Sequence, residues 1–258
     1  MKTIYITCSA LAKYTGHNTY EPLERVVEEL LIKNNLQVGS LPKSTIERGL
    51  RDLSDETLSQ LKTELNLSES TSLGDITKVV KSIVKPSLTT KTEQQSHEAI
   101  AKTIANVESD VLKTLVPSIQ QDVRMIRGCK QEQSDIDAIQ TAREIVVTER
   151  NSKMYCGELY RCKEYVVMLR GKVDGVSNDT IIESKHRTKR LFKVLRSYEQ
   201  VQLESYMFLT GLSNALLTEH YNDTHHCIEY SHDEEFWKEC IQNTVQFMDT
   251  HVRPLLTE

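Results

Sequence analysis

Two carboxylates and one amine lie close together in the stretch 171–185. Asp174 ends one apolar strand pattern, and Glu183 and Lys185 lie on the next. Residues two apart in a strand share a face, so Glu183 and Lys185 point the same way while Ser184 points opposite. Asp174, Glu183 and the backbone carbonyl of Ser184 could hold Mg²⁺ or Mn²⁺, which favour oxygen ligands. With Lys185 orienting or deprotonating a water, or stabilising charge on phosphate, the set suits hydrolysis of a phosphodiester bond.

The same residues also have a purely structural interpretation. An aspartate before a glycine is often a turn residue, and Glu-x-Lys on a strand is often a solvated pair. Three further features favour the metal site: Glu132 on the preceding helical stretch, the basic run after Lys185, and a Gln202/Tyr206 pair on one face of the following helix. They follow the order that a metal nuclease requires.

Positive charge is concentrated directly after the Glu-x-Lys pair. Segment 185–196 contains six Lys or Arg residues and no acid, whereas the rest of the chain has 26 basic against 37 acidic residues. We therefore expect this run to contact a phosphate backbone, with a solvated basic loop as the alternative. The candidate DNA contacts are Arg187, Lys189, Arg190, Lys193 and Arg196.

Composition excludes several classes of protein. The 258 residues are 38% hydrophobic and 27% charged, as in one large globular domain with a sizeable core. No apolar stretch approaches membrane-spanning length, and the N-terminal run is too short for a signal peptide, so we expect an intracellular protein that does not contact membranes. The six cysteines form no C-x-x-C pair, which argues against a structural zinc or iron–sulfur site and favours reduced thiols in a reducing compartment.

Periodicity predicts an α/β core with a mixed central sheet flanked by helices, plus a helical insertion. The core is expected from 1–40 and 118–258 of a single domain, with the insertion at about 41–117. Asn178-Asp179 is expected to turn two strands into a hairpin. Helices are expected at 22–33, 44–53, 55–65, 73–84, 96–115, 118–147, 195–212 and 233–251, and strands at 154–161, 165–176, 180–186, 215–221 and 227–230.

The motif order resembles the PD-(D/E)XK (restriction-endonuclease-like) nuclease superfamily, and within it the lambda-exonuclease and YqaJ-type viral recombinase family. The likeness covers about residues 4–31 and 118–258. It rests on Gly128-x-x-x-Glu132, Val173-Asp174-Gly175, Glu183-x-Lys185 and Gln202-x-x-x-Tyr206, together with Ile6-Thr-Cys-Ser9, Gly16-His-Asn-Thr-Tyr20 and Tyr198-Glu-Gln-Val-Gln202.

The resemblance implies a metal-dependent 5′-to-3′ exonuclease acting on linear double-stranded DNA in recombination, repair or replication of a viral genome. Such enzymes leave a 3′ single strand for an annealing protein and often assemble as a homo-oligomeric ring; a virus-encoded member would act in the host cytoplasm or nucleus. The resemblance makes Ser9 a candidate contact to a terminal 5′ phosphate. It assigns acidic roles to Glu132, Asp174 and Glu183, the catalytic lysine to Lys185, and supporting roles to Gln202 and Tyr206.

Some residues depart from the family pattern. Valine replaces the usual proline before Asp174, and the family's upstream arginine-bearing segment is missing, so Arg124, Arg127 or an inserted helix would have to replace it. Two alternatives stay open. One is an endonuclease or junction resolvase on the same core, and the other is a catalytically silent DNA-binding protein.

Overall fold

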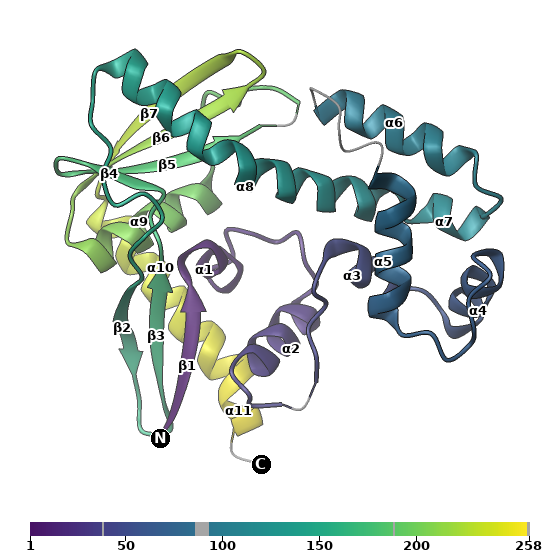
Figure 1. The fold of residues 1–258 in the computed structure, drawn as a ribbon. Coiled ribbons are helices and arrows are strands. Elements are labelled where there is room, and N and C mark those ends of the chain that lie inside the picture. The colour runs from purple at the N-terminus through teal and green to yellow at the C-terminus, as the bar shows by residue number, and fades with distance from the viewer. Residues whose placement is uncertain (38, 86–92, 188, 257–258) are drawn as a thin grey trace. The chain divides into compact units, whose positions relative to one another are not determined.

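A computed structural model describes residues 1–37, 39–85, 93–187 and 189–256, and its contacts divide the chain into two compact units (Figure 1). The αβ unit comprises residues 1–41 and 132–258, and the helical unit comprises residues 42–131. The predicted insertion at about 41–117 falls in the helical unit, which extends further, to Gln131. The longer extent follows from helix α8 (Val116–Arg143), whose first half packs with the helical unit's core.

The αβ unit contains two mixed sheets where the sequence predicted one. The three-stranded sheet has the order β1-β3-β2, with β1 parallel to β3 and β2 antiparallel to it. The four-stranded sheet has the order β4-β5-β6-β7, with β5 parallel to β6 and the other pairs antiparallel. The strands are β1 (Lys2–Thr7), β2 (Tyr155–Arg161), β3 (Tyr165–Gly171), β4 (Gly175–Ser177), β5 (Thr180–His186), β6 (Asn214–Tyr221) and β7 (Thr224–Ser231).

The expected strand 165–176 is interrupted between β3 and β4, and this break separates the two sheets. Gly175 pairs with Ile182 in the β4–β5 ladder. If this register continued, Val173 and Ser184 would form the next hydrogen-bonded pair. Instead the Val173 carbonyl accepts from the backbone of Asn151 at 3.2 Å, and the Ser184 amide donates to the Asp174 carboxylate at 2.8 Å. The hydrogen bonding between β4 and β5 ends here because the Ser184 amide donates to the Asp174 side chain and not to the Val173 carbonyl. The predicted hairpin at Asn178 is present, with the positive φ of 53° that such turns use.

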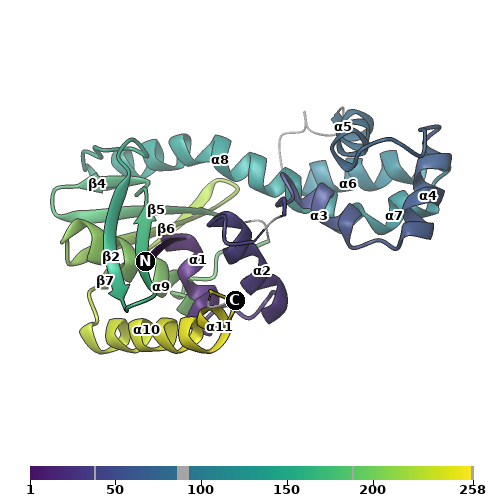
Figure 2. The same ribbon diagram turned by 90° about the horizontal axis from the view of Figure 1, so that it is seen from below.

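Helices cover both faces of the four-stranded sheet. Strand residues alternate, so Ile181 and Leu217 join the core cluster that contains Val201 of α9, while Ile182 joins the cluster that contains Ile136 of α8. Figure 2 shows α8 and α9 on opposite sides of these strands. The other helical segments of this unit are α1 (Cys8–Tyr14), α2 (Leu23–Lys33), α9 (Ser197–Thr210), α10 (Glu234–Phe247), a π turn (Met248–Val252) and α11 (Arg253–Leu256).

The helical unit has its own apolar core, formed by residues that include Leu50, Ile76 and Ile100. The expected helix 96–115 is two helices, because the Ser109 side chain accepts from the Leu112 amide at 2.9 Å and starts a new one. Among the described residues, no helix combines the length and the apolar composition that crossing a membrane requires. The helices are α3 (Thr45–Arg51), α4 (Asp55–Glu64), α5 (Leu73–Val84), α6 (Glu93–Ala105), α7 (Asp110–Thr114) and the first part of α8.

Helix α8 ends at Arg143, four residues earlier than the sequence predicted. Glu144 adopts a positive φ of 54°, which a continuing helix does not tolerate. The chain then places Val147 in the apolar cluster beneath β5 and pairs Thr148 with Val176 of β4. Tertiary pairing therefore decides this end of the helix.

A substitution at Gly175 tests the packing at β4, and a substitution at Gly128 in α8 is its control. A Cβ on Gly175 would lie 2.2 Å from Cγ1 of Val147, so Gly175→Ala must displace a buried side chain and is expected to destabilise the protein by about 1–3 kcal/mol. Gly128, inside α8, has no heavy atom within 4 Å of the position of a Cβ, so Gly128→Ala is expected to stabilise by about 0.5–1 kcal/mol. Thermal melting of both variants measures the difference, and equal melting temperatures would contradict this packing.

Candidate active site

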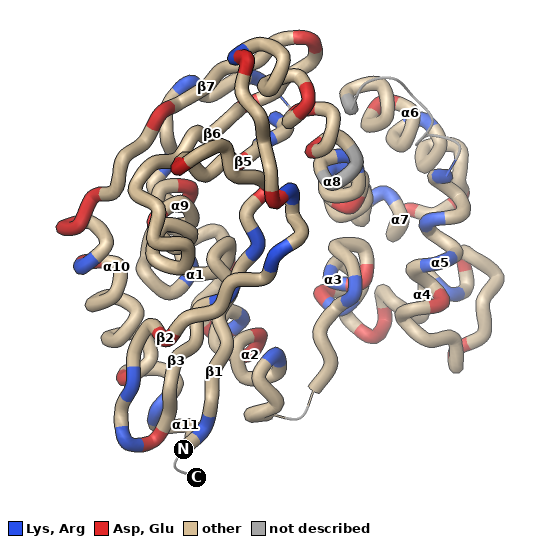
Figure 3. Tube along the Cα trace, turned by 60° about the vertical axis from the view of Figure 1, so that its left-hand side comes forward, with Lys and Arg blue, Asp and Glu red and all other residues tan. Residues whose placement is uncertain are grey.

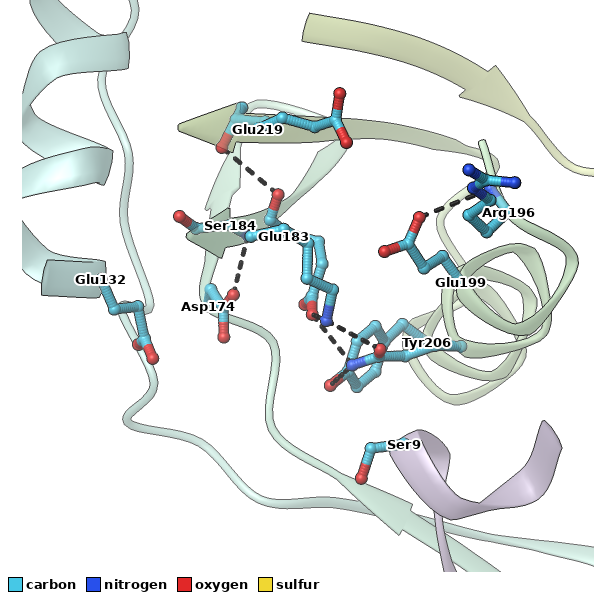
Figure 4. A network of polar contacts seen from close by, with 12 residues as sticks. Ser9, Glu132, Asp174, Glu183, Ser184, Arg196, Glu199, Tyr206 and Glu219 are labelled. Atoms are coloured by element: carbon cyan, nitrogen blue, oxygen red, sulfur yellow. Dashed lines mark hydrogen bonds and ion pairs between the residues drawn. The ribbon is translucent and has the colours of Figure 1, made fainter. Parts of the chain in front are cut away.

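Glu183 and Lys185 on β5 face helix α9, where two of its residues complete a polar network (Figure 4). Glu183 is 3% exposed, and its Oε1 accepts from Lys185 Nζ at 2.6 Å and from Gln202 Nε2 at 2.9 Å. The Gln202 Oε1 accepts from Lys185 Nζ at 3.0 Å, and its Nε2 donates to the Tyr206 hydroxyl at 2.9 Å. The structure therefore brings together four of the predicted site residues through direct hydrogen bonds.

Asp174 lies beside this network in the break between β3 and β4. Its Oδ2 accepts from the Ser184 amide at 2.8 Å, which holds the carboxylate against β5. Burial, with the nearby Glu183 charge as a second cause, raises the pKa of Asp174 to about 9. Two carboxyl groups in this position repel each other unless a proton or a cation lies between them.

The donor set fits a divalent cation. Glu183 Oε2 is buried and has no hydrogen-bond partner among the described residues, so one oxygen of this carboxylate is left for a ligand. A cation bound there would offset the repulsion between Asp174 and Glu183 and lower the raised pKa of Asp174. These two side chains, with the Ser184 backbone carbonyl, are the groups that would hold it.

Glu132 does not complete a three-carboxylate cluster. Its Oε1 accepts from Asn151 Nδ2 at 3.1 Å on the side of α8, although its charge contributes to the raised pKa of Asp174. No group of three His, Cys, Asp or Glu side chains in the described part of the chain has an arrangement that could hold a metal ion. Asp174 and Glu183 act on each other electrostatically, Glu132 adds a third negative charge, and its part in holding a metal ion stays a prediction.

Lys185 is an ammonium group in this arrangement. Burial is the largest single effect and disfavours its charge, but the carboxylates of Glu183, Asp174 and Glu199 together outweigh it and raise the pKa of Lys185 above its usual value. A charged amine donates hydrogen bonds and stabilises negative charge, and it cannot accept a proton from water. Of the roles expected for Lys185, orienting a water and stabilising charge on the phosphate both suit an ammonium group that donates hydrogen bonds.

Arg187, predicted to contact DNA, is a structural residue. Its Nε donates to Glu219 at 2.6 Å and its Nη1 donates to Glu199 at 2.7 Å, and both carboxylates are almost completely buried. The guanidinium also lies 4.3 Å from the centre of the Phe192 ring. The two buried carboxylates give Arg187 a structural role, and its contact with DNA stays a prediction.

The basic residues after Arg187 lie on a loop whose backbone is held by the Glu219 side chain. Its two carboxylate oxygens accept from the backbone amides of Phe192, at 3.3 Å, and Lys193, at 2.7 Å. The remaining predicted contacts, Lys189, Arg190, Lys193 and Arg196, have exposed side chains. The loop thus presents four cations on an anchored backbone.

Ser9, the predicted phosphate contact, is exposed in the first turn of α1, with its hydroxyl 3.4 Å from that of Thr7. Figure 4 shows it on the same side of the network as Tyr206. Close packing holds α1 here, since a Cβ on Gly171 would lie 2.6 Å from Cys8 Sγ and 2.9 Å from Tyr206 Cε1.

Sequence reasoning missed the residues on the opposite face of β5. Asp135 of α8 contacts His186 Nδ1 at 3.3 Å and His220 Nδ1 at 3.6 Å, which attaches α8 to β5 and β6. Only the strand alternation, which points His186 away from Lys185, could have indicated this contact. The buried acids Glu199 and Glu219 were missed as well, because they give no local signal of burial.

No protein-family profile matches this chain, and no curated protein sequence is similar to it. Among solved structures, it is similar to an alkaline exonuclease, LHK-Exo, from Laribacter hongkongensis, with 14% identity and a TM-score of 0.40 over 66% of this chain and 85% of that one. It is also similar to LHK-Exo in complex with dAMP, with 11% identity and a TM-score of 0.40 over 81% of this chain and 92% of that one. At such values the similarity assigns no activity to this chain.

The structural role of Arg187 can be tested by measuring the free energy of unfolding. Arg187→Met leaves Glu199 and Glu219 buried without a cation, and we expect it to destabilise the protein by about 3–5 kcal/mol. Lys189→Met removes an exposed cation of the same run and is expected to change stability by less than about 0.5 kcal/mol. Denaturant unfolding of the two variants provides the comparison. A similar, small effect of both would show that Arg187 is not an anchor.

Proposed function

We propose that this protein is a Mg²⁺- or Mn²⁺-dependent deoxyribonuclease of the PD-(D/E)XK type. The observation that carries the proposal is the buried Glu183 carboxylate, which binds Lys185 through one oxygen, leaves the other without a partner, and acts electrostatically on Asp174. A purely structural Glu–Lys pair would have no reason to leave a buried oxygen unpartnered.

In the proposed mechanism Asp174, Glu183 and the Ser184 carbonyl hold the cation, and the Glu132 charge adds to the acidic field. The bound ion would polarise the scissile phosphate and lower the pKa of an attacking water. Lys185 stabilises the negative charge that builds on the phosphate. Gln202, held by Tyr206, keeps the Lys185 amine and the Glu183 carboxylate at fixed positions.

The local charge of one loop supports the αβ unit as the part that contacts DNA. Its loop offers four exposed cations, Lys189, Arg190, Lys193 and Arg196, next to the site. The helical unit has 13 basic and 12 acidic residues, mixed along its helices (Figure 3). We therefore propose the αβ unit as the nuclease core and the helical stretch as an insertion.

The finer parts of the proposal follow the family resemblance. The substrate would be linear double-stranded DNA, digested 5′ to 3′, with Ser9 contacting a terminal 5′ phosphate. The process would be recombination, repair or replication of viral DNA, with a single-strand annealing protein as partner and a homo-oligomer as the working form.

Substitution of the acid or the amine tests the mechanism. We expect Asp174→Asn and Lys185→Met to lower the rate of degradation of linear duplex DNA by roughly 10²- to 10³-fold, because the first removes a carboxylate that would hold the cation and the second removes the charge that stabilises the phosphate. Lys238→Met is the matched control, since Lys238 on α10 is exposed and pairs with Glu234 at 2.7 Å. Calorimetric titration with Mn²⁺ should show weaker binding by Asp174→Asn. Degradation by both variants at the wild-type rate would refute the mechanism.

The form of the DNA separates exonuclease from endonuclease. We expect end-labelled linear duplex to be degraded in Mg²⁺ or Mn²⁺, and covalently closed circular DNA to remain intact, because an exonuclease needs an end. Duplexes with and without a 5′ phosphate, labelled at either terminus, measure polarity and end preference in the same assay. Cleavage of the closed circle would favour the endonuclease alternative, and binding without metal-dependent cleavage would favour a silent DNA-binding protein.

A further inference from the structure

An exposed aromatic side chain lies near the proposed site. Tyr20 is 83% exposed, yet its ring is in edge contact with that of Tyr198, with 6.4 Å between ring centroids. An exposed ring that a second ring holds in place offers a face on which a nucleobase can stack. Tyr198 is half-buried and supports one side of this ring.

The link that carries Tyr20 is anchored at both sides of the residue. The Asn18 amide donates to the Ala12 carbonyl at 2.9 Å. The Glu21 carboxylate pairs with Lys13 of α1 at 2.5 Å. Tyr20 is therefore presented to solvent by a backbone that is fixed on α1, which keeps the entropic cost of binding small.

Helix α9 connects this ring to the catalytic network. Tyr198, Gln202 and Tyr206 are spaced four residues apart, so they follow one another along one face of the helix. Gln202 and Tyr206 hold Lys185 and Glu183. Tyr198, in the first turn of α9, therefore places the Tyr20 ring at the N-terminal end of the helix that holds the network.

Cations accompany the aromatic residues. Arg196 directly precedes α9 and is exposed, and its guanidinium lies 4.6 Å from the centre of the Phe192 ring. Alternating cations and aromatic rings suit a nucleic-acid strand, because phosphates bind the cations while bases stack on the rings.

We propose that Tyr20, supported by Tyr198, stacks an unpaired nucleobase of a single-stranded DNA segment whose phosphates contact Arg196 and the neighbouring loop cations. This inference rests on the proposed function, because it adds a base-stacking site to the same DNA strand. The partner is single-stranded, since the bases of a duplex already stack on each other and expose only their edges.

Binding without cleavage tests the stacking site separately from the nuclease activity. Fluorescence anisotropy of a labelled oligothymidylate is measured in EDTA, where metal-dependent cutting cannot occur. We expect Tyr20→Ala to weaken binding roughly 5- to 100-fold, the range that loss of one base–aromatic stack produces. Tyr20→Phe keeps the ring and should bind like the wild type. Tyr5→Ala is the matched control, because Tyr5 is another exposed tyrosine that contacts Arg170 instead.

An oligonucleotide of the same length with abasic sites distinguishes stacking from backbone binding. We expect wild type and Tyr20→Ala to bind it equally, because no base is left to stack. Equal binding of the thymidylate strand by both proteins would overturn the proposal, and so would an equal loss on the abasic strand. No measurable affinity of the wild type for single strands would also overturn it, while the duplex degradation assay would still report on the nuclease independently. Thermal melting confirms that each variant is folded.

Discussion

Burial of the Glu183 carboxylate is the constraint on which the site and much of the αβ unit depend. An unpaired buried charge costs several kcal/mol, so a fold that buries one must place donors around it. Lys185 from the same strand and Gln202 from α9 meet this requirement, which fixes α9 on this face of β5. The donors satisfy only one oxygen, the second has no partner, and the charge of the group acts on the nearby Asp174. A divalent cation would offset the unfavourable electrostatic energy of the two neighbouring carboxylates. The same arrangement therefore destabilises the metal-free site and supports the proposed activity.

A second pair of buried carboxylates in the αβ unit is also neutralised by a cation. Glu199 and Glu219 are buried, and Arg187 lies between them. Because Glu219 also binds the backbone amides of Phe192 and Lys193, the charge pair orders the loop that follows. A basic run that looks uniform in sequence therefore divides into one buried anchor and several exposed cations. Only the exposed ones are available to a phosphate backbone.

Strand β5 joins two helices through opposite faces. Glu183 and Lys185 contact α9, and His186 contacts Asp135 of α8. Period-two alternation made the first face predictable from the spacing of Glu183 and Lys185. Asp135 could not be predicted, because a contact between a helix and a strand 51 residues away leaves no mark on local periodicity. The same applies to the contact between Tyr20 and Tyr198.

Local pattern by itself determined the α/β class, the type and order of most elements, the hairpin at Asn178, and the common face of Glu183 and Lys185. These features depend on periodicity and turn chemistry, which neighbouring residues carry. Only the tertiary structure decided the break between β3 and β4, the division into two sheets, and the burial of Arg187. Each of these depends on which distant group takes a hydrogen bond or neutralises a buried charge. The free energy of such pairing is set by three-dimensional surroundings, and those are not encoded in the spacing of residues along the chain.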